Sequence, residues 1–99
     1  MKEIYYIDID GVICTNTYGK YHDAEPYYEN IKKINKLYEE GNHIVLWTAR
    51  GTKLEYDWIP ELTEKQMKEW GVKYHELKFG KPYYDYIIDD RCKDIDEID

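Results

Sequence analysis

The sequence IYYIDIDGV, residues 4–12, decides the fold expected for this chain. Its β-branched and aromatic residues favour a β-strand, and the nearly continuous apolar run is typical of a strand inside a parallel sheet. The run ends in two carboxylates, Asp8 and Asp10, and Gly11 allows the backbone to turn sharply after them. We therefore expect a buried strand that carries acid groups to the carboxyl edge of an open α/β sheet, where such sheets bind ligands.

Length and composition predict a single globular domain over residues 1–99. The net charge of −7, without a basic stripe, argues against a protein that binds nucleic acid polymers through their phosphates. No stretch approaches the roughly 20 apolar residues that span a bilayer, so we expect no membrane segment. Cys14 and Cys92 show no spacing typical of a disulfide framework or a metal site. We expect a cytoplasmic protein with reduced thiols.

The remaining pattern alternates strands and helices. Apolar residues recur at helical spacing between Pro26 and Gly41, which predicts a helix there. The other expected elements, in chain order, are a strand at 43–47, a short helix between a capping box at 63–66 and Gly71, an edge strand within 72–79, a strand at 86–88 and a helical turn after 93. This order predicts an α/β fold with a minimal Rossmann-like parallel sheet of about four strands, in the order 4-1-2-3, flanked by helices.

Three apolar runs stop at polar groups, and the carboxyl ends of parallel strands meet at one edge of a sheet. One crevice should therefore contain Asp8, Asp10, Thr48, Asp89 and Asp90, with Lys81 able to reach in from its loop. Four carboxylates repel one another strongly, and a single lysine cannot offset them. Oxygen ligands without nearby His or Cys suit Mg²⁺, which binds one or two carboxylates together with a substrate phosphate. The charge distribution therefore favours phosphoryl transfer.

In this order, the residues Asp8-Ile9-Asp10-Gly11-Val12, Thr48, Lys81 and Asp89-Asp90 resemble the four motifs of the haloacid dehalogenase-like (HAD) superfamily. More narrowly, Thr48-Ala49-Arg50, Gly80-Lys81-Pro82 and Asp89-Asp90-Arg91 are similar to the motifs of small capless HAD phosphatases of capsule and polysaccharide biosynthesis. The resemblance spans nearly the whole chain. It implies a capless HAD core that hydrolyses phosphomonoesters with Mg²⁺ as its cofactor.

The resemblance also implies a catalytic role for four residues. Asp8 would be the nucleophile that forms an aspartyl-phosphate, and its other oxygen would bind Mg²⁺. Asp10 would protonate the leaving oxygen and then activate water, while its backbone carbonyl ligates the metal. Thr48 would hold the phosphoryl group, and Lys81 would balance the charges of nucleophile and phosphate. An acid at position 10 favours a phosphatase over a dehalogenase, because ester hydrolysis needs a proton donor there.

The remaining site residues follow from the same resemblance. Four acids are implied at the metal site: Asp8, Asp10, Asp89 and Asp90. Substrate binding would fall to Thr48, Lys81 and Arg50. Two interpretations of Arg50 stay open, contact with the substrate phosphate or an ion pair with an acid at the rim.

The chain has no insert long enough to form a cap domain after Asp10 or after Thr48. Substrate selection is therefore expected from a flap at residues 18–22, from Arg50, from residues 53–58 or from a neighbouring subunit. We expect a homo-oligomer whose assembly closes the site.

The expected partner is a small phosphorylated metabolite, and the resemblance favours a sugar phosphate of polysaccharide biosynthesis. Two alternatives remain. A nucleotide phosphatase would use an aromatic stacking slot formed by Tyr18, Tyr21 or Trp58. A non-catalytic phosphate-binding or assembly module would bind metal without turnover.

Overall fold

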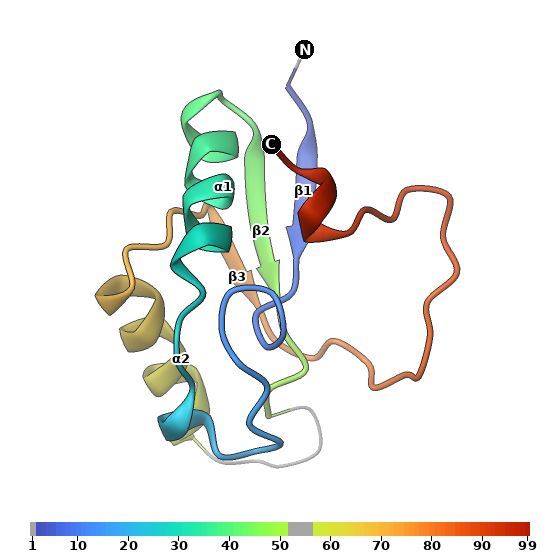
Figure 1. The fold of residues 1–99 in the computed structure, drawn as a ribbon. Coiled ribbons are helices and arrows are strands. Elements are labelled where there is room, and N and C mark those ends of the chain that lie inside the picture. The colour runs from blue at the N-terminus through green and yellow to red at the C-terminus, as the bar shows by residue number, and fades with distance from the viewer. Residues whose placement is uncertain (1, 52–56) are drawn as a thin grey trace.

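The computed structural model describes residues 2–51 and 57–99, which form a small α/β fold around a parallel three-stranded sheet (Figure 1). Strand β2 (His43–Trp47) lies in the middle, with β1 (Ile4–Ile7) on one side and β3 (Glu76–Lys78) on the other. Both pairings are parallel, and Tyr6 lies opposite Val45. All three strands therefore end at the same edge, as expected for a Rossmann-like sheet.

Two helices make the crossovers between these strands. Helix α1 (Tyr28–Glu39) connects β1 to β2 and buries Ile31, Ile34 and Leu37, which recur at helical spacing. Helix α2 (Trp58–Glu69) connects β2 to β3. The predicted strand at 43–47, the predicted helix within 26–41 and the predicted edge position of the third strand are confirmed.

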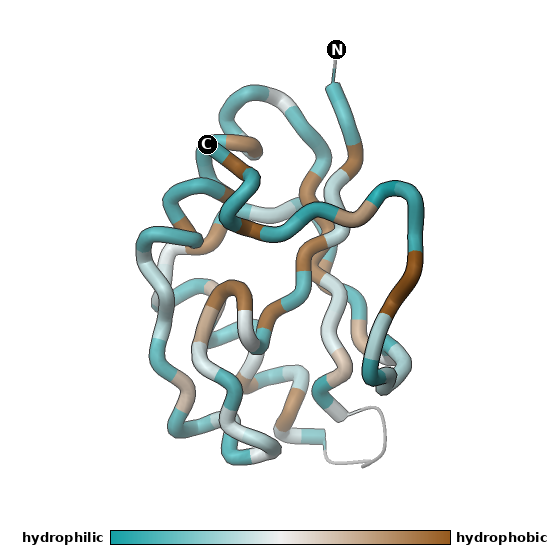
Figure 2. Tube along the Cα trace, turned by 45° about the vertical axis from the view of Figure 1, so that its right-hand side comes forward, coloured by the Kyte–Doolittle hydropathy of each residue, from teal (hydrophilic) through white to brown (hydrophobic). Residues whose placement is uncertain are grey.

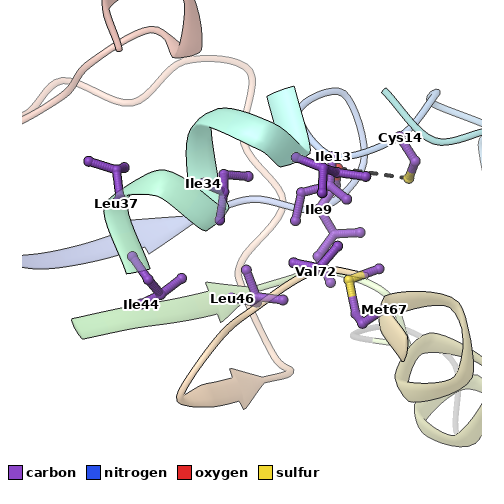
Figure 3. Packing of buried hydrophobic residues seen from close by; sticks show 10 residues of the cluster. Ile9, Ile13, Cys14, Ile34, Leu37, Ile44, Leu46, Met67 and Val72 are labelled. Carbon is purple, nitrogen blue, oxygen red and sulfur yellow. Dashed lines mark hydrogen bonds between the residues drawn. The ribbon is translucent and has the colours of Figure 1, made fainter. Parts of the chain in front are cut away.

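The hydrophobic core lies between one face of the sheet and the helices (Figure 3). Ile44 and Leu46 alternate along β2 and face α1, because successive side chains of a strand point to opposite faces. Met67 of α2 belongs to the same cluster. On the other face, Ile4 is 69% exposed and Tyr6 is 53% exposed. The helices thus cover one face of the sheet, and the other face is open along β1.

The predicted fourth strand at 86–88 does not form, so the predicted order 4-1-2-3 is wrong and the observed order is β1-β2-β3. The chain leaves β3, swings out on the β1 side of the sheet and returns at the 3-10 turn η2 (Ile95–Glu97) (Figure 1). Ile95 and Ile98 pack against the core and fix the far end of this loop. Hydrophobic residues on the loop lie outside the body of the protein (Figure 2).

Helix α2 begins earlier than predicted. Pro60 lies in its first turn, where a backbone N–H would have no helical partner, so proline is tolerated there. Thr63 lies inside the helix, and its hydroxyl donates to the carbonyl oxygen of Ile59 at 2.8 Å. The capping box predicted at 63–66 is therefore wrong.

In the described part of the chain, each helix is too short and too polar to cross a membrane.

Replacing Ile34 by alanine should destabilise the fold, because this side chain is 0% exposed in the centre of the core. We expect Ile34→Ala to lower the free energy of unfolding by about 2–5 kcal/mol, measured by urea denaturation. The matched control is Ile4→Ala on the open face, where the same change should cost less than about 1 kcal/mol. Equal losses at the two positions would contradict this placement of the core.

Candidate functional site

The carboxyl ends of β1 and β2 open into a cavity of about 740 Å³. Asp8 and Asp10 enter it from the end of β1, and Lys81 enters it from the loop after β3. The segment between β1 and α1 contributes further lining residues, among them Tyr18 and Tyr21. The structure thus brings Asp8, Asp10 and Lys81 together, as the sequence predicted.

Asp8 and Lys81 form an ion pair at this cavity, with 3.3 Å between Oδ2 of the carboxylate and Nζ of the lysine. The other carboxylate oxygen accepts a hydrogen bond from the backbone N–H of Ile9 at 2.8 Å. Burial raises the pKa of Asp8 by more than the positive charge of Lys81 lowers it, so the pKa lies above its ordinary value. The carboxylate keeps 38% of its side-chain surface exposed and remains open to a ligand.

Lys81 is held among aromatic rings. Its Nζ lies 5.7 Å from the centre of the Trp47 ring and 5.3 Å from that of Tyr84. Burial lowers the pKa of Lys81, but the hydrogen bond with Tyr84 and the charge of Asp8 outweigh this effect, and the pKa is raised. The lysine therefore carries its positive charge at neutral pH.

Asp10 is bound by Arg50 at both carboxylate oxygens. The guanidinium donates from Nε to Oδ2 and from Nη2 to Oδ1, each at 2.9 Å. Its third nitrogen donates to Thr63 at 3.1 Å and to Gln66 at 2.6 Å. Arg50 is only 1% exposed, and the Tyr21 ring covers it at 4.6 Å. Of the two interpretations of Arg50, the structure shows the ion pair with an acid.

Thr48 lies at the end of β2 but is fully buried and does not line the cavity. Its hydroxyl accepts a hydrogen bond from the backbone N–H of Arg50 at 3.1 Å. Its carbonyl oxygen accepts one from the N–H of Lys81, also at 3.1 Å, and its own N–H donates to the carbonyl of Lys78. In this arrangement Thr48 positions the two cationic residues of the site.

The segment after β1 turns tightly beneath the cavity. Gly11 has a φ of 89°, which favours glycine, and its N–H donates to the carbonyl of Cys14 at 2.8 Å. Tyr18 and Gly19 form a second tight turn, with φ angles of 53° and 99°. Burial raises the pKa of the Cys14 thiol to about 12, so this buried cysteine is not a nucleophile at neutral pH.

Asp89 and Asp90 do not join the other two acids. Both are exposed on the loop after β3 and lie outside the cavity lining. Over residues 2–51 and 57–99, no three His, Cys, Asp or Glu side chains lie close enough to hold a metal ion. Asp8 supplies an oxygen ligand of the kind that Mg²⁺ prefers, but the carboxylate set around it is incomplete.

Two polar residues of α2, Thr63 and Gln66, belong to the site although the sequence analysis did not assign them there. The sequence pattern could have indicated them, because they share the buried face of α2 with Ile59 and Met67, and buried polar side chains need hydrogen-bond partners. Gln66 also donates to the carbonyl of Tyr21 at 2.7 Å and ties the segment after β1 to the helix.

Of the other residues expected to select the substrate, only some lie in the described part of the chain. Residues 53–56 of the expected 53–58 segment lie outside the described residues. Trp58 stacks on His22, with 5.2 Å between ring centres, and both line a separate depression of about 230 Å³. The aromatic residues at the main cavity are Tyr18, Tyr21, Tyr83 and Tyr84.

Comparison with known proteins supports the fold. The structure is similar to the crystal structure of a target protein from Vibrio cholerae, with a TM-score of 0.81 and 28% sequence identity. The match covers 98% of this chain and 86% of the other. No protein-family model and no curated protein matches the sequence.

Removing the charge of Asp10 should destabilise the protein much more than removing that of Asp8. Asp10→Asn leaves the buried Arg50 without its anion, and we expect a loss of about 3 kcal/mol, the low end for a broken buried ion pair. Asp8→Asn is the matched control and should cost less than about 1 kcal/mol, because burial disfavours the charged form of Asp8. Urea denaturation at pH 7 would measure both, and equal losses would contradict the assignment.

Proposed function

We propose that this protein is a Mg²⁺-dependent phosphomonoester hydrolase of HAD type, acting through an aspartyl-phosphate on a small phosphorylated metabolite. The observation that carries the proposal is the partly exposed Asp8 carboxylate, paired with a protonated Lys81 at a cavity on the carboxyl edge of a parallel sheet. A site that only binds phosphate would not need a carboxylate where the phosphate enters, because the two anions repel each other. A carboxylate beside a fixed cation has a function at this position if it acts as the nucleophile.

In the first step a carboxylate oxygen of Asp8 attacks phosphorus, and the bond between phosphorus and the ester oxygen breaks. Both reactants are anionic, so their approach needs positive charge. The ammonium of Lys81 lies at 3.3 Å from Asp8 and would also contact a non-bridging phosphoryl oxygen. In the second step water attacks the aspartyl-phosphate, releases inorganic phosphate and restores the Asp8 carboxylate.

Proton transfer in this proposal falls to Asp10. The leaving oxygen needs a proton in the first step, and the attacking water must lose one in the second. Arg50 fixes the orientation of the Asp10 carboxylate. Its Oδ1 also accepts a hydrogen bond from the Cys14 thiol, whereas Oδ2 keeps a second lone pair that can hold a proton. Arg50 is then a positioning residue and not a phosphate ligand.

Mg²⁺ would be held by Asp8 and by the backbone carbonyl of Asp10, with further ligands from water and the substrate phosphate. When bound, the ion would neutralise charge on the phosphoryl oxygens. The oxygen chemistry of these donors fits Mg²⁺.

The cavity volume of about 740 Å³ lies in the range of small-molecule sites. Asn16 and Thr17 provide polar groups at its wall, which suit a sugar phosphate. Tyr18 and Tyr21 at the same cavity favour a second candidate, a nucleotide whose base stacks on an aromatic ring.

The test is phosphate release from a panel of sugar phosphates, nucleotides and an aryl phosphate, with and without Mg²⁺. We expect Mg²⁺-dependent release by the wild type and a loss of at least about 1,000-fold in Asp8→Asn, because the amide is not a nucleophile. The preferred ester would identify the substrate class.

Two controls make this test decisive. Urea denaturation of Asp8→Asn shows whether the variant is folded. Lys65→Ala, an exposed position on α2 outside the main cavity, should retain wild-type activity. Metal binding by the wild type without turnover on any ester would support the non-catalytic module and refute the proposal.

The pH dependence should report the environment of Asp8. Its carboxylate must be ionised to attack, so activity should fall as the pH drops through a value above the ordinary carboxyl pKa of about 4. Lys81 lowers this pKa, so Lys81→Met should move the acid limb of kcat/KM to higher pH besides reducing the rate. An unchanged acid limb in Lys81→Met would show that Asp8 is not the titrating group.

A further inference from the structure

One hydroxyl group at the main cavity has no hydrogen-bond partner. Thr17 lines the cavity from the segment between β1 and α1, and its Oγ1 is shielded from solvent. Within the described residues, no donor or acceptor forms a hydrogen bond with this oxygen. A hydroxyl that is withdrawn from water without a partner costs free energy, so buried hydroxyls are normally bonded. The place of this hydroxyl at a cavity indicates that its partner comes from a ligand.

Two neighbouring threonines show the ordinary arrangement. The hydroxyl of Thr15 accepts a hydrogen bond from the backbone N–H of Glu25 at 3.0 Å, and the hydroxyl of Thr63 donates to the carbonyl of Ile59 at 2.8 Å. Packing does not explain the exception at Thr17, because valine has the same shape and no hydroxyl to desolvate. The polar atom of Thr17 therefore requires an explanation of its own.

Thr17 begins a tight turn that can shift. The N–H of Lys20 closes this turn by donating to the carbonyl of Thr17 at 3.3 Å. Tyr18 has a φ of 53°, which is unfavourable for a bulky residue, and its side chain is 96% exposed. A Cβ atom added to Gly19 would meet no atom within 4 Å, so the tip of the turn packs against nothing. A strained and unpacked turn moves at low cost, and its movement can open the neighbouring hydroxyl to the cavity.

Both ends of the segment that carries this turn are fixed. The N–H of Thr15 donates to the carbonyl of Glu25 at 2.9 Å, besides the bond at the Thr15 hydroxyl. On the other side, Gln66 of α2 donates to the carbonyl of Tyr21 at 2.7 Å. Movement is therefore confined to the turn between these anchors, and Thr17 stays at the wall of the cavity.

We propose that Thr17 is a specificity-determining residue whose hydroxyl binds a sugar hydroxyl of the phosphorylated ligand. The phosphate lies at Asp8 and Lys81 according to the proposed function, on which this inference rests. A sugar hydroxyl both donates and accepts, as the threonine hydroxyl does, so the two groups satisfy each other in either direction. The sugar is that of a free sugar phosphate or that of a nucleotide, since both carry hydroxyl groups near the phosphate.

Urea denaturation without ligand tests whether the hydroxyl is unpaired. Thr17→Val keeps the shape of the side chain and removes the hydroxyl, so we expect the urea midpoint to stay the same or to rise. The matched control is Thr63→Val, because the Thr63 hydroxyl bonds both Ile59 and Arg50. This control should raise the unfolding equilibrium constant at least about tenfold. An equal loss of stability in Thr17→Val would overturn the proposal.

Calorimetric titration in the presence of Mg²⁺ tests the ligand, with Asp8→Asn as the background variant to prevent turnover. Glucose 6-phosphate is compared with cyclohexylmethyl phosphate, which has the same ring size and phosphate but no hydroxyl group. We expect glucose 6-phosphate to bind more tightly, and we expect Thr17→Val to lower this preference at least about tenfold. Thr17→Ser should keep the preference, because it keeps the hydroxyl.

A second pair of ligands identifies the source of the sugar. Adenosine 5′-monophosphate is compared with its 2′,3′-dideoxy analogue, which lacks both ribose hydroxyls. A preference that depends on Thr17 in the first pair indicates a free sugar phosphate, and one in the second pair indicates a nucleotide. Either result supports the proposal. The absence of such a preference from both pairs, or the absence of binding by all four compounds, would overturn it.

Failure of the proposed function is distinguishable from failure of this proposal. A protein that binds either pair with a preference that depends on Thr17, but releases phosphate from no ester, would refute the hydrolase and leave the sugar-binding role of Thr17. A protein that releases phosphate with a preference insensitive to Thr17→Val would refute the role of Thr17 and leave the hydrolase.

Discussion

The bidentate ion pair between Asp10 and Arg50 is the interaction on which the rest of the site depends. Two carboxylates one residue apart at a strand end repel each other, and the fold gives each its own cation. Arg50 is buried against Asp10 at the wall of the cavity, whereas Lys81 pairs with the more exposed Asp8. The first pair orients Asp10, and the second leaves the Asp8 carboxylate partly exposed to a ligand. Because Arg50 and Lys81 are buried to different degrees, the chemically identical side chains of Asp10 and Asp8 lie in different environments.

The Arg50 pair also connects elements that are distant in sequence. Its guanidinium joins the end of β1 to Thr63 and Gln66 of α2, and its backbone N–H is held by Thr48 at the end of β2. Because every donor on this buried side chain has a partner, the network fixes one arrangement of sheet and helix. The position of α2 is therefore set by polar contacts as well as by the apolar contacts of Met67.

The sequence predicted most of the fold where periodicity was clear. The strand at 43–47, the helix within 26–41 and the meeting of Asp8, Asp10 and Lys81 follow from patterns that local physics determines. The start of α2 was missed because the capping pattern at 63–66 indicated a later start, whereas Pro60 is compatible with a first turn. The fourth strand was predicted wrongly for another reason, since an apolar run indicates strand propensity but not whether the segment pairs with a neighbouring strand. The contacts of Arg50 could not be predicted from the sequence either, because they depend on three elements packing together.

Thr48 connects Lys81 to β3, the shortest strand of the sheet. Strand β3 has only three residues, and the N–H of Thr48 bonds to Lys78 while its carbonyl holds Lys81. Short edge strands open locally at a free energy well below that of global unfolding. Each opening of β3 would release the anchor of Lys81 and separate the ammonium from Asp8. Local fraying of this edge strand then determines the fraction of molecules in which Lys81 is paired with Asp8. On heating, Lys81 would separate from Asp8 at a temperature below that at which the core unfolds.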